Sequence, residues 1–201
     1  MTKLISDHYV NQLYKLHHFK KSFGTAGKYK GLLSWFETLQ PKSLLDYGCG
    51  KGNLMFNLKE KYPACNFSGY DPGIDAFKEL PTETYDALIC TDVLEHVAEE
   101  DLSWVVDEIF SYAKKMVFLN VACFKAMKTL PDGRNAHISI FSPDDWIQML
   151  AEKSRNFKHL TIYMFADTIV EGEENKYETQ GYRIDQYPRI IKMKNKAEEE
   201  N

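Results

Sequence analysis

The sequence predicts an α/β domain with a doubly wound, mostly parallel sheet, and three observations lead to this fold class. Short apolar segments typical of buried strands alternate with longer amphipathic segments typical of helices, which is the pattern of a parallel sheet covered on both faces. A glycine-rich turn at 48–52 follows the first of these strands. The 201 residues, 44% hydrophobic and 27% charged, suffice for one such domain with a sizeable core.

Two segments before the first strand have helical periodicity. Residues 4–20 place apolar side chains at helical spacing and predict an amphipathic helix, which Gly24 and Gly27 interrupt. A second helix is expected over 28–39, ending before Pro41.

The central part of the chain alternates between strand and helix patterns. A polar segment then separates two strands of a C-terminal antiparallel pair, for which we expect a hairpin. Ser142 is the expected N-cap of the last helix, with Pro143 in its first turn. In chain order we expect a strand at 43–47, a helix at 52–61, strands at 65–70 and 85–91, a helix at 99–113, a strand at 115–122, a helix at 143–155, and paired strands at 158–166 and 180–191 around a loop at 171–180.

These elements predict one domain. Residues 1–40 form an N-terminal helical cap that belongs to it, residues 41–191 carry the sheet, and residues 192–201 form a disordered polar tail. We find no internal repeat.

Composition excludes several classes of protein. A net charge of −4 argues against a strongly basic nucleic-acid-binding surface. No apolar run is long enough to span a membrane, and the N-terminus lacks the apolar core of a signal peptide. We therefore expect no membrane partner. No C-x-x-C pair occurs, so we expect the cysteines to be small buried residues of a reduced, cytoplasmic protein. The cysteines are Cys49, Cys65, Cys90 and Cys123.

Polar and glycine residues follow the first two strands, at the edge where ligands bind in such sheets. The backbone of Gly48-Cys49-Gly50 can approach a ligand closely, and Asp46 can hold the loop or a ligand ammonium group. Asp71, in SGYDPG, can accept two hydrogen bonds from ribose hydroxyls; alternatively, it caps a turn.

Three stretches, LLDYGCGKGNL, GYDPG and YDALICTDVLEHV, together resemble motifs of class I S-adenosylmethionine (SAM)-dependent methyltransferases over residues 43–150. The spacing G-x-G-x-G differs from the G-x-G-x-x-G of dinucleotide-binding proteins. The resemblance implies SAM as the cofactor and assigns its binding residues. These are Asp46, Gly48, Cys49 and Gly50 in the SAM loop, Asp71 at the ribose, and Thr91 and Asp92 beside the methionine end.

The sequence departs from this family after the second strand. Only fifteen positions separate Asp71 from Asp86, too few for a helix, a strand and a loop, so we expect an abbreviated segment there. The region normally supplies adenine contacts. No acidic adenine ligand is therefore assigned, and Phe77 or Leu80 is the candidate for an apolar wall.

The stretch TDVLEHV and the later DGRNAHIS contain acidic and histidine residues, and we consider three hypotheses for their role. In the first, His96 is a general base for the methyl acceptor, which makes His96 and His137 the candidate catalytic residues. In the second, Asp92, Glu95, His96 and His137 bind a divalent metal, Mg²⁺, Mn²⁺ or Zn²⁺. In the third, Glu95 and His96 only cap the helix and shape the pocket.

The metal hypothesis rests on a further resemblance. The order D-x-x-E-H with a later histidine is similar to the E-x-x-E-H plus histidine of two methyltransferase groups, one acting on RNA 3′-terminal 2′-hydroxyls and one on catechol-like ubiquinone precursors. The first residue here is one methylene shorter.

We therefore expect a SAM-dependent methyltransferase that acts on an oxygen or nitrogen of a small molecule. One alternative is a metal-assisted methyltransferase of RNA 3′-terminal 2′-hydroxyls. The other is a non-catalytic SAM-fold protein that binds a partner or senses SAM. The sequence leaves the oligomeric state open.

Overall fold

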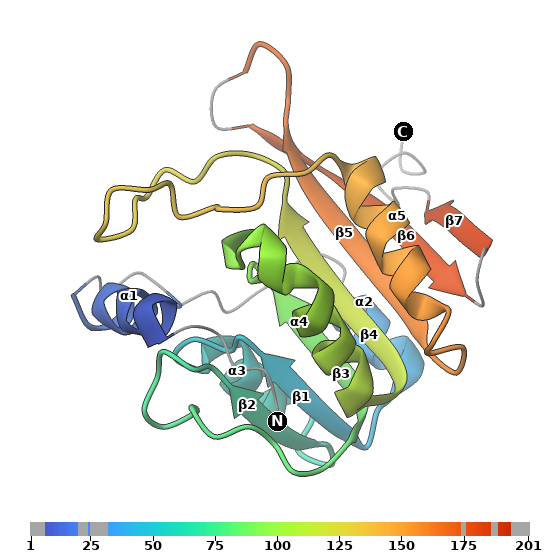
Figure 1. The fold of residues 1–201 in the computed structure, drawn as a ribbon. Helices are drawn as coiled ribbons and strands as arrows, with labels where there is room; N and C mark the ends of the chain where they lie inside the picture. Colours follow the sequence, from blue (N-terminus) through green and yellow to red (C-terminus); the bar gives the residue numbers. More distant parts are fainter. Residues whose placement is uncertain (1–6, 20–23, 25–31, 174–175, 186–188, 194–201) are drawn as a thin grey trace.

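The fold is a seven-stranded sheet flanked by helices (Figure 1). The computed structural model describes residues 7–19, 24, 32–173, 176–185 and 189–193. The strands are β1 (Ser43–Tyr47), β2 (Asn66–Tyr70), β3 (Tyr85–Thr91), β4 (Ala113–Ala122), β5 (Thr161–Ile169), β6 (Tyr177–Asp185) and β7 (Arg189–Met193). The helices are α1 (Asp7–Phe19), α2 (Leu32–Leu39), α3 (Asn53–Lys61), the 3₁₀ turn η1 (Leu94–His96), α4 (Glu99–Tyr112) and α5 (Pro143–Ser154).

The strand order is β2-β1-β3-β4-β5-β6-β7. The first five strands in that order pair in parallel, β6 is antiparallel to β5, and β7 is antiparallel to β6. From β1 the chain moves outward to β2 and then returns to the other side of β1 with β3. This reversal is a topological switch point, where loops leave in opposite directions and open a crevice. The doubly wound, mostly parallel sheet predicted from the sequence is confirmed.

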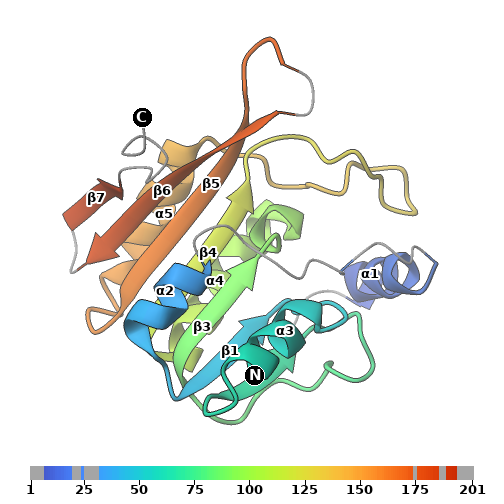
Figure 2. The ribbon, with the colours of Figure 1, turned by 180° about the vertical axis from the view of Figure 1, so that it is seen from behind.

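Helices cover both faces of the sheet because successive strand residues point to opposite sides. Leu45 packs with α4 and α5 in one fully apolar cluster, while Leu44 packs with α2 and α3 in another. Figure 1 shows α4 and α5 in front of the sheet, and Figure 2 shows α2 and α3 in front of its other face. The two cores make the strands rigid supports for the loops at their ends.

The helix-entry signal at 142–143 forms a capping box. The Ser142 hydroxyl accepts a hydrogen bond from the Asp145 N–H at 3.2 Å, and the Asp145 carboxylate accepts one from the Ser142 N–H at 3.3 Å. Pro143 occupies the first turn, where its missing N–H costs nothing. The predicted N-cap is confirmed.

The predicted N-terminal elements are found in part within the described residues. The segment 4–20 contains α1, and 28–39 contains α2, which ends at Leu39 before Pro41. Residues 1–6, 20 and 28–31, together with Gly27, lie outside the described residues. Several predicted elements start or end slightly differently: β4 begins at Ala113 rather than at residue 115, and β5 covers Thr161–Ile169 rather than 158–166.

The C-terminal strands differ from the prediction. The predicted strand at 180–191 is two strands, because β6 ends at Asp185 and β7 begins at Arg189. The predicted hairpin loop at 171–180 was too long, because β6 already starts at Tyr177. Polar residues pair here as strand, since the Thr179 hydroxyl donates to the Asp167 carboxylate across the β5–β6 ladder. Strand residues that pair through polar side chains show no alternation of apolar and polar residues in the sequence, so the start of β6 was not predicted.

The segment between β2 and β3 is abbreviated, as predicted. Residues 71–84 form turns and contain neither a helix nor a strand. As a result β2 is an edge strand of the sheet. At the other end of the chain, β7 extends to Met193, into the range 192–201 expected to form a tail, and residues 194–201 lie outside the described residues. Every helix in the described part of the chain is too short or too polar to span a bilayer.

We predict that Ser142→Ala lowers the free energy of unfolding by about 1 kcal/mol, because the first turn of α5 loses its side-chain cap. Urea denaturation followed by circular dichroism measures the change. Ser103→Ala is the matched control, since Ser103 is an exposed residue inside α4. Equal stabilities of the two variants would contradict the capping role.

Candidate functional site

One cavity of about 610 Å³ lies at the carboxyl ends of the central strands. All the residues that the sequence singled out for cofactor, catalytic or metal roles line it, although they come from four separate loops. They are Asp46, Gly48, Cys49, Gly50, Asp71, Thr91, Asp92, Glu95, His96 and His137. The two other sequence candidates, Phe77 and Leu80, are not among its lining residues. The Phe77 ring lies against Phe56, and Leu80 packs against the core.

The glycine turn after β1 has no room for side chains at Gly48 and Gly50. Gly48 has a φ of +79°, and a Cβ atom there would lie 2.2 Å from a methyl group of Val93. Gly50 also has a positive φ, of +53°. The turn is attached to the neighbouring strand by the Gly48 N–H, which donates to the Tyr70 carbonyl at 2.7 Å. Its backbone can therefore face a ligand directly.

Cys49 is a structural part of this turn. Its thiol is buried and donates to the Gly50 carbonyl oxygen at 3.6 Å. Burial raises the pKa of the Cys49 thiol, with further increases from the nearby carboxylates of Asp46 and Asp71. The thiol therefore stays protonated and does not act as a nucleophile.

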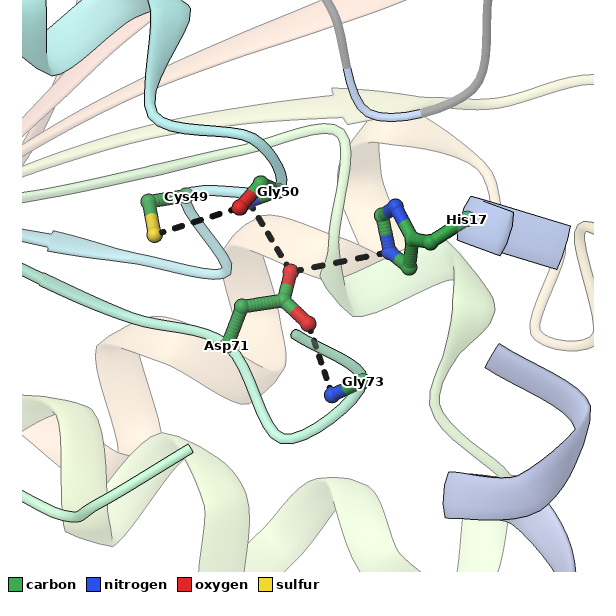
Figure 3. A network of polar contacts seen from close by, with 5 residues as sticks. All are labelled: His17, Cys49, Gly50, Asp71 and Gly73. Carbon is green, nitrogen blue, oxygen red and sulfur yellow. Dashed lines mark hydrogen bonds and ion pairs between the residues drawn. The ribbon is translucent and has the colours of Figure 1, made fainter. Parts of the chain in front are cut away.

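Asp71 connects the glycine turn to the loop after β2. Its carboxylate accepts hydrogen bonds from the N–H of Gly50 at 2.9 Å and from the N–H of Gly73 at 2.8 Å (Figure 3). His17 of α1 reaches the same carboxylate, with Nε2 3.8 Å from Oδ2 (Figure 3). Burial raises the pKa of the Asp71 carboxyl, whereas His17 and the two N–H groups oppose that rise.

Asp46 has a buried oxygen atom that is not satisfied by the protein. The residue is 2% exposed, and its Oδ2 has no hydrogen-bond partner among the described residues. Burial, aided by the charge of Asp71, raises the pKa of Asp46 to about 7. A buried carboxylate oxygen without a donor is costly, which indicates that a ligand supplies the missing donor.

Glu95, His96 and His137 form a cluster whose ligand atoms all lie within 4.8 Å of one another. The two imidazoles are oriented by backbone carbonyls. His96 Nδ1 lies 2.7 Å from the Ala136 oxygen, and His137 Nδ1 lies 2.5 Å from the Phe124 oxygen. A carbonyl only accepts, so Nδ1 of each ring carries the proton and Nε2 is the nitrogen able to bind a metal.

The ionisation of the cluster also suits a metal. Burial lowers the pKa of His96 to about 4, so its ring is neutral near pH 7. Glu95 is fully buried, with Oε1 accepting from the Ala122 N–H at 3.0 Å and Oε2 without a partner among the described residues. Burial and the nearby Asp92 raise the pKa of Glu95. A raised pKa means that ionising the buried Glu95 carboxyl costs free energy, and the positive charge of a divalent ion would offset that cost.

Asp92 lies outside this cluster, so the structure brings together three of the four residues proposed as metal ligands. Asp92 has a φ of +54°, and its Oδ1 accepts a hydrogen bond from the Asn120 amide at 3.1 Å. The same amide nitrogen donates to Asp167 at 3.0 Å. Asp92 is thereby directed toward β4 and β5.

Sequence reasoning missed several polar residues at or beside the cavity, among them His17, Asn120 and Asp167. Asn120 and Asp167 come at the carboxyl ends of two predicted strands, and that position is a signal that could have identified them. His17 gave no such signal, because a histidine on an amphipathic helix is common on ordinary helix surfaces.

A family model described as a methyltransferase domain matches residues 23–161, which is more than half of the chain. No curated protein sequence matches the chain at a significant level.

Several solved methyltransferase structures are remotely similar. The plantazolicin methyltransferase BpumL in complex with S-adenosylhomocysteine (SAH) is 12% identical, with 84% of this chain and 73% of that chain covered and a TM-score of 0.48. PigF with SAH is 15% identical, with 73% and 53% covered and a TM-score of 0.41. The sugar N-methyltransferase KedS8 from Streptoalloteichus sp ATCC 53650 is 12% identical, with 96% and 79% covered and a TM-score of 0.35.

We predict that Gly48→Ala destabilises the fold by about 2–5 kcal/mol, because it adds a steric clash with Val93 to the strain of a positive φ. Gly133→Ala isolates the strain alone, since Gly133 has a φ of +89° and nothing within 4 Å of an added Cβ. That control should lose only about 1–2 kcal/mol. Chemical denaturation of both variants gives the comparison, and equal losses would show that the Val93 contact is unimportant.

Proposed function

The chain belongs to the family of methyltransferase domains, and we propose that it transfers the methyl group of SAM to an oxygen or nitrogen atom of a small molecule. The observation that carries this proposal is the unpartnered Asp46 oxygen, which lies in the same cavity as the glycine turn and Asp71. One SAM molecule could use all three, with its ammonium group at Asp46, its ribose at Asp71 and the part between them against the backbone of the glycine turn. A cavity of about 610 Å³ is also in the usual range for such a ligand.

In this proposal, Asp46 accepts from the ammonium group of the methionine end, with Thr91 and Asp92 nearby. The backbone of Gly48-Cys49-Gly50 faces the cofactor, and Asp71 accepts from the ribose hydroxyls. A carboxylate has about four acceptor positions, and Asp71 uses two for backbone N–H groups, so it retains capacity for the ribose.

The charge of the cavity supports a cationic cofactor. Five carboxylates line it, whereas Lys128 is the only lysine or arginine among its described lining residues. SAM carries both a sulfonium and an ammonium group, so it gains favourable electrostatic interactions there. The same charge disfavours a phosphate-rich acceptor, which supports a small molecule over an RNA end. The five carboxylates are Asp46, Asp71, Asp92, Glu95 and Asp167.

When bound, SAM supplies an electrophilic methyl group, and the protein has mainly to align the acceptor with it. The loop at 123–142 contributes Phe124, Met127 and Lys128 to the lining, on the proposed acceptor side. These side chains are the proposed contacts of the acceptor.

We further propose that Glu95, His96 and His137 hold a divalent metal ion. Two imidazoles and one carboxylate favour Zn²⁺ or Mn²⁺ over Mg²⁺, which prefers oxygen ligands. The ion would orient an acceptor hydroxyl and lower its pKa. This role explains the low pKa of His96 better than general-base catalysis does, because a base with a pKa of about 4 holds a proton weakly at pH 7.

The alternative functions make different demands. Methylation of an RNA 3′-terminal 2′-hydroxyl would use the same metal cluster, but its phosphates would meet a cavity rich in carboxylates. A non-catalytic protein that senses SAM or binds a partner would need the cofactor groups and no metal. The oriented histidine pair therefore favours catalysis over sensing.

We predict that Asp71→Ala weakens SAH binding at least about tenfold, because the ribose loses charge-assisted hydrogen bonds. Calorimetric titration with SAH measures the loss, and Asp71→Asn serves as a second variant that keeps the side-chain shape. Asp75→Ala is the control, since Asp75 is exposed and lies only four residues away. Unchanged SAH affinity in a folded Asp71→Ala protein would refute the ribose assignment.

We predict that the protein purified in the presence of Zn²⁺ or Mn²⁺ retains about one metal ion per chain, and that His137→Ala lowers the metal affinity at least about tenfold because a ligand is removed. Metal content after dialysis and Co²⁺ absorption spectra provide the measurements. His18→Ala is the control, because His18 is exposed on α1. A wild-type protein that neither retains metal nor binds Co²⁺ would exclude the proposed centre.

A further inference from the structure

We infer that α1 forms one wall of the cofactor site and that His17 positions the ribose together with Asp71. This inference rests on the proposed binding of SAM. It assigns to the N-terminal helix a direct part in cofactor affinity.

His17 is directed at the carboxylate that is proposed to bind the ribose. It is 7% exposed, and its Nε2 lies 3.8 Å from Asp71 Oδ2, within ion-pair range but beyond hydrogen-bond distance (Figure 3). His17 also lines the cavity, as does Leu13 one turn before it. A ribose hydroxyl that reaches Asp71 therefore meets the imidazole of His17 on the other side.

The helix packs directly on the turn that follows Asp71. A Cβ atom on Gly73 would lie 2.9 Å from Leu13 Cβ and 3.2 Å from His17 Cδ2. Only a residue without a side chain allows α1 to come this close. The Gly73 N–H is also one of the two donors to Asp71, so helix and carboxylate are positioned by the same turn.

A second contact holds the N-terminal segment over the glycine turn. The Gly24 carbonyl accepts a hydrogen bond from the Lys51 N–H at 2.9 Å. A Cβ atom on Gly50 would lie 2.8 Å from the Gly24 Cα. The N-terminal segment thus touches both loops that Asp71 joins. Three of its residues, Leu13, His17 and Gly24, line the cavity.

The place of α1 in the fold suits a movable wall. It lies apart from the two helix layers, beside the carboxyl ends of the strands (Figures 1 and 2). Of the loop at 72–84 only Pro72 lines the cavity, whereas α1 contributes Leu13 and His17. A helix that packs around a binding site is stabilised when the ligand adds contacts to it.

The experiment compares two ligands on several variants. SAH contains the ribose and the amino-acid end, whereas 5′-methylthioadenosine contains the ribose without the amino-acid end. We expect His17→Ala to weaken the binding of both ligands about tenfold, because the ribose loses one polar contact. His17→Gln, which retains a polar donor, should restore part of the affinity.

Three further variants separate the position of α1 from the chemistry of His17. His18→Ala should bind both ligands like the wild type, because His18 is exposed on the same helix and stacks on Tyr14. Asp46→Asn should weaken SAH and leave 5′-methylthioadenosine unchanged, since its proposed contact is the ammonium group. Gly73→Ala should reproduce the effect of His17→Ala without removing a polar side chain, because the new methyl displaces Leu13.

The outcomes are distinct. Wild-type affinity of His17→Ala for both ligands, or a loss confined to SAH, would overturn the inference and leave the proposed function intact. A wild-type protein that binds neither ligand would overturn the proposed function itself. If His17→Ala does not fold, hydrogen exchange of the wild-type protein tests the inference instead. Slower exchange in α1 on adding 5′-methylthioadenosine supports the inference, and unchanged exchange refutes it.

Discussion

The carboxylate of Asp71 holds together the loops on which the rest of the site depends. Strands β1 and β2 run in parallel register, so their ends lie side by side, and the loops that follow would diverge without a connection. Asp71 accepts one N–H from each loop, at Gly50 and at Gly73. Because both bonds are buried, water does not compete with them. Asp71 thereby joins the glycine turn to the loop on which α1 packs.

The other half of the site is organised by backbone rather than by side chains. The loop at 123–142 crosses the carboxyl ends of the strands, and its carbonyl oxygens at Phe124 and Ala136 orient the two histidines. The carbonyl of Glu95 in turn accepts the N–H groups of two residues in that loop at 2.7 and 3.0 Å. The loop and the cluster therefore fold as a unit. Because the accepting groups at Phe124 and Ala136 are backbone carbonyls, the orientation of the histidines depends on the path of the loop more than on the side chains at these two positions.

The sequence predicted those features that depend on local pattern. Strand β1, the capping box at Ser142 and the abbreviated segment after Asp71 were identified because each leaves a short-range signal. The residues that the sequence named for the SAM loop, the ribose, catalysis and the metal also line one cavity, since parallel strands end at a common edge, whereas Phe77 and Leu80 do not. Their chemical roles stay predictions.

Long-range contacts account for what the sequence did not predict. His17 meets a carboxylate far along the chain, which helical periodicity does not encode. Asp92 was grouped with Glu95 as a metal ligand, but it has a positive φ and its carboxylate accepts from the amide of Asn120. The early start of β6 was hidden because Thr179 pairs through a polar contact rather than an apolar one.

The buried Asp46 has a thermodynamic consequence for ligand binding. Because burial raises the pKa of Asp46 to about 7, its protonated and ionised forms coexist near neutral pH. A cation placed beside it stabilises the ionised form and lowers the pKa, so association releases a fraction of a proton to the solvent. The heat of binding would then depend on the ionisation enthalpy of the buffer, and a measurement in one buffer alone would mix the intrinsic enthalpy with that of buffer protonation.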